Sequence, residues 1–244
     1  MKISRYKKIS KNKYKLYFED GKTINIFDDI ILKYKLLLKK EIDEETYKNI
    51  VKDNNNYMAY DLALTYINIR VRCEKEIVEY LKKKEIHDNL IKETINKLKK
   101  NGFLNEKEYI RSFSNDKFNL SNYGPNKIKK ELKSLGLNTE LIEELVNFTK
   151  EEILEKLEKL IDKKIKQNKN YSGNVLRNRL TTYFYNLGFN KSDIDAVLNN
   201  KDLTNEDQYQ KEYNKLLKKY ERKYSGYELE QIIKQKLYLK GFTK

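Results

Sequence analysis

The sequence has very few of the residues that interrupt regular structure or crosslink a fold. Its 244 residues include one proline, eight glycines, one cysteine and no tryptophan. So few chain breakers favour long helices over a sandwich of short strands joined by many turns. The single cysteine, Cys73, excludes an internal disulfide and suits a reducing cytoplasm. Neither Cys73 nor the lone His87 has neighbours at metal-ligand or catalytic spacing, so we expect a packed thiol and a surface imidazole.

Long apolar runs and catalytic motifs are also missing. No run approaches the roughly 18 to 20 residues that cross a bilayer, and the amino terminus leads into no signal-peptide core. The sequence contains no glycine-rich phosphate loop, no paired carboxylates in a plausible pocket segment and no set of Ser, His and Asp. We therefore expect a cytoplasmic protein that is not an enzyme and that uses no metal or cofactor.

Positive charge is present in excess, with 52 Lys and Arg against 37 Asp and Glu and a net charge of +15. The excess is +5 in residues 1–56, +3 in 57–148, +3 in 149–200 and +4 in 201–244. A positive surface that is spread out in this way favours a long polyanionic partner, such as nucleic acid or a filament containing it. Because 45 of the basic residues are lysines and Asn, Ile and Tyr are also abundant, a composition bias on a solvated surface explains the charge equally well.

The first part of the chain predicts a small α+β head. Residues 13–27 alternate apolar and polar side chains on both sides of Asp20-Gly21, a pair suited to a type I′ turn, and this pattern predicts a β-hairpin. Residues 28–53 predict two short helices, with Asp43 capping the second. The run Asn54-Asn55-Asn56 predicts a linker after the head.

Beyond this run, the sequence repeats itself with a period of 51 to 53 residues. An apolar triplet at i, i+4 and i+9 occurs four times, as Ile77, Leu81, Ile86; Ile128, Leu132, Leu137; Leu180, Phe184, Phe189; and Ile233, Leu237, Phe242. Three copies have a glycine at i+8, where a left-handed residue ends a helix, namely Gly136, Gly188 and Gly241. The first copy has Glu85 instead, which predicts a less tightly closed turn.

Each repeat is predicted to form three helices, and the fourth copy stops after its second helix. Thr149 with Glu152, and Ser225 with Glu228, fit the capping box. Gly124-Pro125 marks a turn before a second helix, where the missing proline donor costs nothing. The third helices are predicted at 88–100, 139–148 and 191–199.

The resulting fold class is mainly α, with tandem three-helix repeats in an extended curved array behind a small α+β head that contains a β-hairpin. The predicted domains are the head at 1–56, three-helix repeats at 57–104, 105–148 and 149–200, and a partial repeat at 201–244.

The candidate binding residues are basic side chains at the end of the first helix of the first repeat and on the second helices of the first three repeats. Arginine is the more selective type, because its guanidinium fork recognises carboxylates and phosphates. We expect Arg70 and Arg72 at the end of one helix, and Arg177 and Arg179 on the second helix of the third repeat. The lysine candidates, on the second helices of the first two repeats, are Lys82, Lys83, Lys84, Lys127, Lys129, Lys130 and Lys133. Together these groups predict a basic stripe, with ordinary solvated helix faces as the other interpretation.

Two blocks of the sequence match a known family. The first runs from Ala59 to Leu104 and contains Arg70-x-Arg72-x-Glu74 and then Gly102-Phe103-Leu104-Asn105; the second is Tyr123-Gly124-Pro125 followed by Ile128, Glu131, Leu132 and Gly136. Residues 57–244 resemble RecX proteins, and the head and fourth repeat resemble the longer members. The chain departs from the family pattern with Cys73 for Ser, Asn105 for Asp and Glu85 for Gly.

The resemblance implies binding to the RecA recombinase, within the helical groove of the RecA and single-stranded DNA filament, where ATP hydrolysis, strand exchange and filament growth would be damped. We expect a monomer whose basic stripe bridges neighbouring RecA subunits. Replacing Arg70 and Arg72 with Glu is expected to weaken filament binding without unfolding the protein.

Two other functions remain open. A glycine-turned helix pair is also the outline of a helix-turn-helix module, which allows an autonomous DNA-binding protein. Against it, no helix is expected to concentrate Asn, Gln and Arg as a base-reading surface. The other alternative is a non-catalytic helical scaffold whose charge is incidental.

Overall fold

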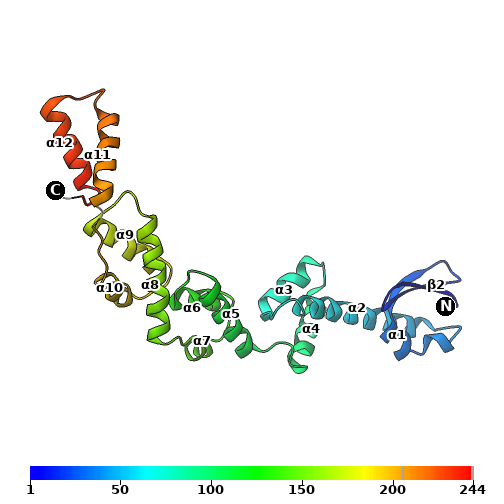
Figure 1. The fold of residues 1–244 in the computed structure, drawn as a ribbon. Coiled ribbons are helices and arrows are strands. Elements are labelled where there is room, and N and C mark those ends of the chain that lie inside the picture. The colour runs from blue at the N-terminus through cyan, green and yellow to red at the C-terminus, as the bar shows by residue number, and fades with distance from the viewer. Residues whose placement is uncertain (205, 243–244) are drawn as a thin grey trace. The chain divides into compact units, whose positions relative to one another are not determined.

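The computed structural model describes residues 1–204 and 206–242. The chain forms two compact units, Met1–Tyr109 and Ile110–Lys244. Helices dominate both units, and the first also carries a small sheet (Figure 1). The mainly α fold with a small α+β head is therefore confirmed. Residues 205, 243 and 244 of the predicted fourth repeat lie outside the described residues.

The head is built on a three-stranded antiparallel sheet of order β1-β2-β3, with β1 at Ile3–Ser10, β2 at Lys13–Phe18 and β3 at Thr23–Phe27. The predicted hairpin is β2–β3, whereas β1 was not predicted because its exposed side chains carry little apolar alternation. The predicted type I′ turn is wrong. Gly21 alone has a positive φ there, of 84°, and Asp20 instead accepts a hydrogen bond from the backbone N–H of Lys22 at 3.0 Å.

Four helices and one short 3-10 turn complete the head and the first repeat. They are α1 (Asp28–Lys33), η1 (Leu36–Leu38), α2 (Glu44–Ile67), α3 (Glu74–Lys83) and α4 (Asp88–Lys100). The carboxylate of Asp43 caps α2 as predicted and accepts the backbone N–H of Thr46 at 2.6 Å.

The predicted linker at residues 54–56 is wrong, because these residues lie inside the 24-residue helix α2. Asn54 is buried, accepts the backbone N–H of Phe27 at 3.1 Å and donates to the carbonyl of Asn25 at 2.9 Å. A polar run that looks solvated in the sequence therefore ties α2 to the sheet. The helix crosses the predicted boundary between residues 56 and 57 and joins the head to the first repeat (Figure 1).

The remaining helices are α5 (Glu106–Leu120), α6 (Pro125–Ser134), α7 (Thr139–Leu145), α8 (Lys150–Gln167), α9 (Gly173–Asn186), α10 (Lys191–Leu198), α11 (Glu206–Tyr220) and α12 (Gly226–Tyr238). Pro125 is the first residue of α6, and Thr149 forms the predicted capping box with Glu152. The second predicted capping box is wrong, since Ser225 makes no side-chain cap bond. The next residue, Gly226, is left-handed at φ 54°, which turns the chain away from the geometry that such a cap needs.

The apolar triplets form the cores of the repeats. Eleven of the twelve triplet side chains are buried, and Leu137 is half-buried. The expected looser turn at Glu85 is wrong: Glu85 adopts the left-handed conformation at φ 59°, and the N–H of Ile86 donates to the carbonyl of Leu81 at 3.1 Å. The equivalent bond at the Gly188 turn, between Phe189 N–H and the Phe184 carbonyl, measures 3.2 Å. The backbone thus closes alike with or without the glycine.

Consecutive repeats of the second unit meet through backbone atoms. The N–H of Gly124 donates to the carbonyl of Leu187 at 2.7 Å, and in the next pair the N–H of Ser172 donates to the carbonyl of Lys240 at 2.9 Å. A Cβ on Gly188 would lie 2.3 Å from the backbone nitrogen of Lys127. Glycine is therefore required here both for its positive φ, 91° at Gly188, and for this close approach.

Candidate functional site

Arg70 and Arg72 lie in the loop between α2 and α3, because α2 already ends at Ile67. The expectation that they end a helix is wrong. The Arg72 guanidinium lies 3.9 Å from the centre of the Tyr66 ring, and that ring stacks on Tyr80 at 4.1 Å. Only 10% of the Arg72 side chain is exposed. Arg72 is thus a packing residue of the first repeat.

Arg70 is half exposed and forms an ion pair with Glu76 at 2.5 Å. Glu76 also accepts the backbone N–H of Cys73 at 3.1 Å, which caps the start of α3. Burial opposes the ionisation of Glu76, but the bonds from Arg70 and from the Cys73 N–H outweigh it and lower the pKa of the Glu76 carboxyl. The ion pair with Glu76 therefore offsets part of the positive charge of Arg70.

These contacts change the interpretation of the double arginine substitution. A glutamate at position 72 would place an anion beside Glu76 and remove the cation from the Tyr66 ring. The double change to Glu is therefore expected to disturb the first repeat, contrary to the prediction from sequence. Arg70 is the residue of this pair that a partner can reach.

Of the four lysines of α6, two form ion pairs with a neighbouring helix. Lys129 and Lys133 both bind the carboxylate of Glu143 on α7, at 2.6 and 2.8 Å. Hydrogen bonds from these two ammonium groups lower the pKa of Glu143 to about 2. Lys127 covers the Tyr123 ring at 4.0 Å, and Lys130 is exposed.

The lysines at the end of α3 face solvent. Lys82 lies 3.5 Å from Asp88, and Lys84 lies 5.7 Å from the centre of the Tyr80 ring. Lys83, between them in the sequence, is exposed. Because both contacts are solvent-screened, these three ammonium groups keep most of their attraction for an anionic partner.

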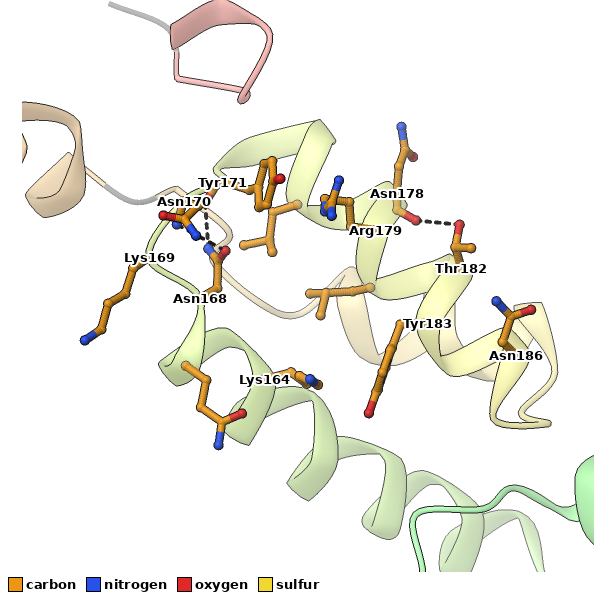
Figure 2. Close-up of a pocket in the computed structure, with 13 residues that line it drawn as sticks. Lys164, Asn168, Lys169, Asn170, Tyr171, Asn178, Arg179, Thr182, Tyr183 and Asn186 are labelled. Carbon is orange, nitrogen blue, oxygen red and sulfur yellow. Dashed lines mark hydrogen bonds between the residues drawn. The ribbon is translucent and has the colours of Figure 1, made fainter. Parts of the chain in front are cut away.

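The two arginines of α9 have different surroundings. Arg177 donates to Asn199 at 2.7 Å and lies 3.4 Å from Asp195, so it ties α9 to α10. Arg179 instead lies over the Tyr171 ring, 4.0 Å from its centre, in a groove between α8 and α9 (Figure 2). The candidates in the first unit and those in the second are thus placed within their own units, and a continuous basic stripe stays a prediction.

The groove contains residues that the sequence did not single out. Lys164 and Lys169 line it together with Tyr183. Helix α9 carries Asn174, Arg177, Asn178, Arg179 and Asn186. The expectation that no helix concentrates Asn, Gln and Arg as a base-reading surface stays a prediction. The sequence signal of the groove is the polar loop of residues 168–170 between two helices, which contains none of the apolar residues that define the repeats.

The described residues show neither a cluster suited to a metal ion nor a helix that could cross a membrane. No group of three or more His, Cys, Asp or Glu side chains there is arranged to hold a metal ion. No helix in the described ranges is both long and apolar enough to cross a membrane.

Two family models match the chain in the region of the first two repeats. The model described as "RecX, first three-helix domain" matches residues 59–98, and the one described as "RecX, second three-helix domain" matches residues 105–146. The first range contains α3 and α4 as far as residue 98, and the second contains α5, α6 and α7. Both therefore coincide with helical segments of the structure.

Curated proteins and solved structures are similar over longer ranges. The chain is 30% identical to the regulatory protein RecX of Bacillus cereus (strain AH820), over 97% of this chain and 91% of that protein. It is 29% identical to the regulatory protein RecX of Oceanobacillus iheyensis, over 99% and 94%. A crystal structure of regulatory protein RecX superposes with a TM-score of 0.65 at 22% identity, covering 81% of this chain and 98% of that one. The crystal structure of RecX from Lactobacillus salivarius gives 0.54 at 28% identity, covering 60% and 96%.

Proposed function

Because this chain belongs to the RecX family, we propose that it binds the filament of RecA on single-stranded DNA and inhibits its ATPase, strand exchange and extension. The observation that carries the proposal is the 30% identity to a regulatory protein RecX over 97% of the chain. The protein acts by binding, without a catalytic step of its own, and works in the cytoplasm where RecA and DNA meet.

The tandem repeats suit a helical partner. In the second unit, the same backbone contact between consecutive repeats holds equivalent helices in a fixed relation. We therefore expect these helices to contact successive filament subunits at the same time. Several weak contacts on one chain gain strength from effective concentration. We propose that the exposed cations Arg70 and Lys83 of the first unit and Lys130 of the second each contact the filament. Bridging of neighbouring RecA subunits then resists the rearrangements that accompany ATP turnover.

The decisive experiment is a titration of this protein into the RecA of the same organism, with the single-stranded-DNA-dependent ATPase rate measured at fixed salt. Inhibition well below one copy per RecA supports filament binding that acts over many subunits. An unchanged rate at excess protein contradicts the proposal.

A charge variant and a matched control test whether the end of α3 contacts the filament. Changing Lys82, Lys83 and Lys84 together to Gln removes three cations at the end of α3, and is expected to raise the concentration needed for half inhibition several-fold. The control changes Lys35, Lys39 and Lys40 in the head, which are also exposed, and loses the same charge. Equal effects of the two variants would show that net charge, and not the α3 surface, matters.

Direct DNA binding is the second candidate function, and the composition of α9 favours it. Steep salt dependence of binding to naked DNA, together with an unchanged RecA ATPase, would support it over filament regulation. Failure to bind either DNA or the filament would point to a scaffold.

A further inference from the structure

A groove of about 730 Å³ lies between the carboxyl-terminal part of α8 and the exposed side of α9. Figure 2 shows Lys164 on α8 facing Tyr183 on α9, with Tyr171 and Arg179 toward the connecting loop. The groove is broadly open to solvent. A polymer can therefore lie along it, which an enclosed pocket would prevent.

The charged side chains that line the groove are all positive. Lys164, Lys169 and Arg179 line it, and no carboxylate does. Among the described residues, none of these three cations forms an ion pair with an acidic side chain, in contrast to Lys129 and Lys133 on Glu143. The groove therefore presents positive charge that the protein does not neutralise, as a phosphate-binding surface does.

Two tyrosine rings are held against two of these cations. The guanidinium of Arg179 lies 4.0 Å from the centre of the Tyr171 ring, and the ammonium of Lys164 lies 4.4 Å from that of Tyr183. The amide of Asn168 donates to the backbone carbonyl of Tyr171 at 2.6 Å and so fixes the loop. Tyrosine rings and planar guanidinium groups are the surfaces on which unpaired bases stack.

Apart from the hydroxyl of Thr182, the remaining polar residues of the lining carry side-chain amides, namely Gln167, Asn168, Asn170, Asn178 and Asn186. Each amide offers both donors and an acceptor, so it can bond to base edges of either kind. An acidic protein segment would use the cations but would leave the rings and the amide acceptors without a role. The bases of a duplex are stacked inside it and cannot reach the rings.

From these observations we propose that the groove between α8 and α9 binds single-stranded nucleic acid directly. Phosphates contact Lys164, Lys169 and Arg179, and bases stack at Tyr183 and on the pair of Tyr171 with Arg179. This binding requires no RecA. It rests on the second candidate function, direct DNA binding, to which it assigns one groove and a single-stranded ligand, and it is tested independently of filament regulation.

The test measures the fluorescence anisotropy of a fluorescein-labelled oligothymidylate as the full-length protein is added. The groove variant combines Lys164→Gln with Tyr183→Ala. Its matched control combines Lys163→Gln with Tyr185→Ala, because both control residues are exposed neighbours on the same helices that do not line the groove. Tyr183 and Tyr185 are 38% and 62% exposed, so both variants are expected to fold, which circular dichroism checks.

The groove variant is expected to weaken binding about tenfold or more, the loss that one stacked base and one phosphate contact would give, while the control changes it about twofold or less. Equal losses in the two variants would overturn the proposal, because binding would then be diffuse. A labelled polyglutamate that binds as tightly, and that loses affinity through the same groove variant, would also overturn it in favour of an acidic protein partner.

Arg179→Gln provides a second variant that keeps both rings in place, and it should also weaken oligothymidylate binding. Its control is Lys191→Gln at the start of α10, which removes one exposed cation outside the groove. The RecA ATPase assay separates the two proposals. A groove variant that loses oligothymidylate binding but still inhibits RecA supports the groove and leaves filament regulation intact, whereas full oligothymidylate binding in both groove variants contradicts the groove alone.

Discussion

Individual side chains show that similar residues in this chain serve different purposes. Arg72 and Arg179 both lie over tyrosine rings, at 3.9 and 4.0 Å. Arg72 is 10% exposed and also contacts Glu76, whereas Arg179 is exposed and lines an open groove. The guanidinium of Arg72 therefore stabilises the first repeat, and that of Arg179 is available to a ligand.

At the residue scale, Glu85→Gly is expected to stabilise the protein. Glu85 is exposed and left-handed, at φ 59°, a conformation that glycine adopts without steric penalty. Part of the gain is offset by the greater freedom of glycine in the unfolded chain, so we expect an increase of about 0.5–1 kcal/mol in the free energy of unfolding. Urea denaturation measures it, and Glu85→Ala, which keeps the penalty, should show no gain.

The two hydrogen bonds to the Glu143 carboxylate predict that the stability of the protein depends on pH through Glu143. Its pKa is lowered to about 2 by hydrogen bonds from Lys129 and Lys133, so the folded state favours the ionised carboxylate. This contribution is fully present above the ordinary glutamate pKa of about 4.3 and is lost as pH falls toward 2. Glu143→Gln should destabilise by about 0.5–1 kcal/mol at pH 7, the size of a solvent-screened pair, and by less near pH 2. A destabilisation that stays constant with pH would contradict this assignment.

At the element scale, the backbone contact between repeats depends on Gly188. We predict that Gly188→Ala destabilises the second unit more than Gly136→Ala does. Both glycines have a positive φ, 91° and 80°, but a Cβ at Gly136 meets nothing within 4 Å, whereas one at Gly188 meets the backbone of Lys127 at 2.3 Å.

The expected difference is about 1–3 kcal/mol, the range for forcing an extra carbon into a packed contact. The free energy of unfolding of the two variants gives it directly. Similar losses for both glycines would mean that the contact yields easily and that only the backbone conformation matters.

Helix α2 shows how far an element can depart from a local pattern. The Asn run at 54–56 predicts a linker by composition, yet α2 continues through it because the buried Asn54 bonds to the backbone of Phe27 and Asn25. Both partners lie almost thirty residues earlier in the chain. Local helix propensity does not depend on hydrogen bonds to such distant residues, so the sequence pattern could not predict that the helix continues.

At the scale of the whole molecule, the net charge of +15 is spread over all segments of the chain. We predict that binding to single-stranded DNA weakens with salt, with a logarithmic slope that decreases by about 0.7 for each cation lost from the contact. Changing Lys164 and Arg179 together to Gln should therefore flatten the slope by about 1.4. Anisotropy titrations at several salt concentrations measure it, and an unaltered slope would remove these two side chains from the phosphate contacts.

The sequence by itself determined the repeat and its helices. The spacing of apolar side chains decides which face of a helix is buried, and glycine at the helix end decides where the chain turns. Both are local properties, so the third helices fall where predicted, with α7 ending three residues early at Leu145. The family resemblance followed from the same local blocks around Arg70 and Gly124.

Only the tertiary structure decided which cations are available to a partner. Lys129 and Lys133 share the carboxylate of Glu143 on the following helix, which offsets one of their two charges, while Arg177 is held by Asp195 and Asn199 on α10. Lys164 and Arg179, from different helices, meet in one groove without an acidic side chain. Whether a charged side chain is available to a partner depends on the groups around it in space. Those neighbours are determined by how the helices pack against one another, which the sequence pattern does not specify.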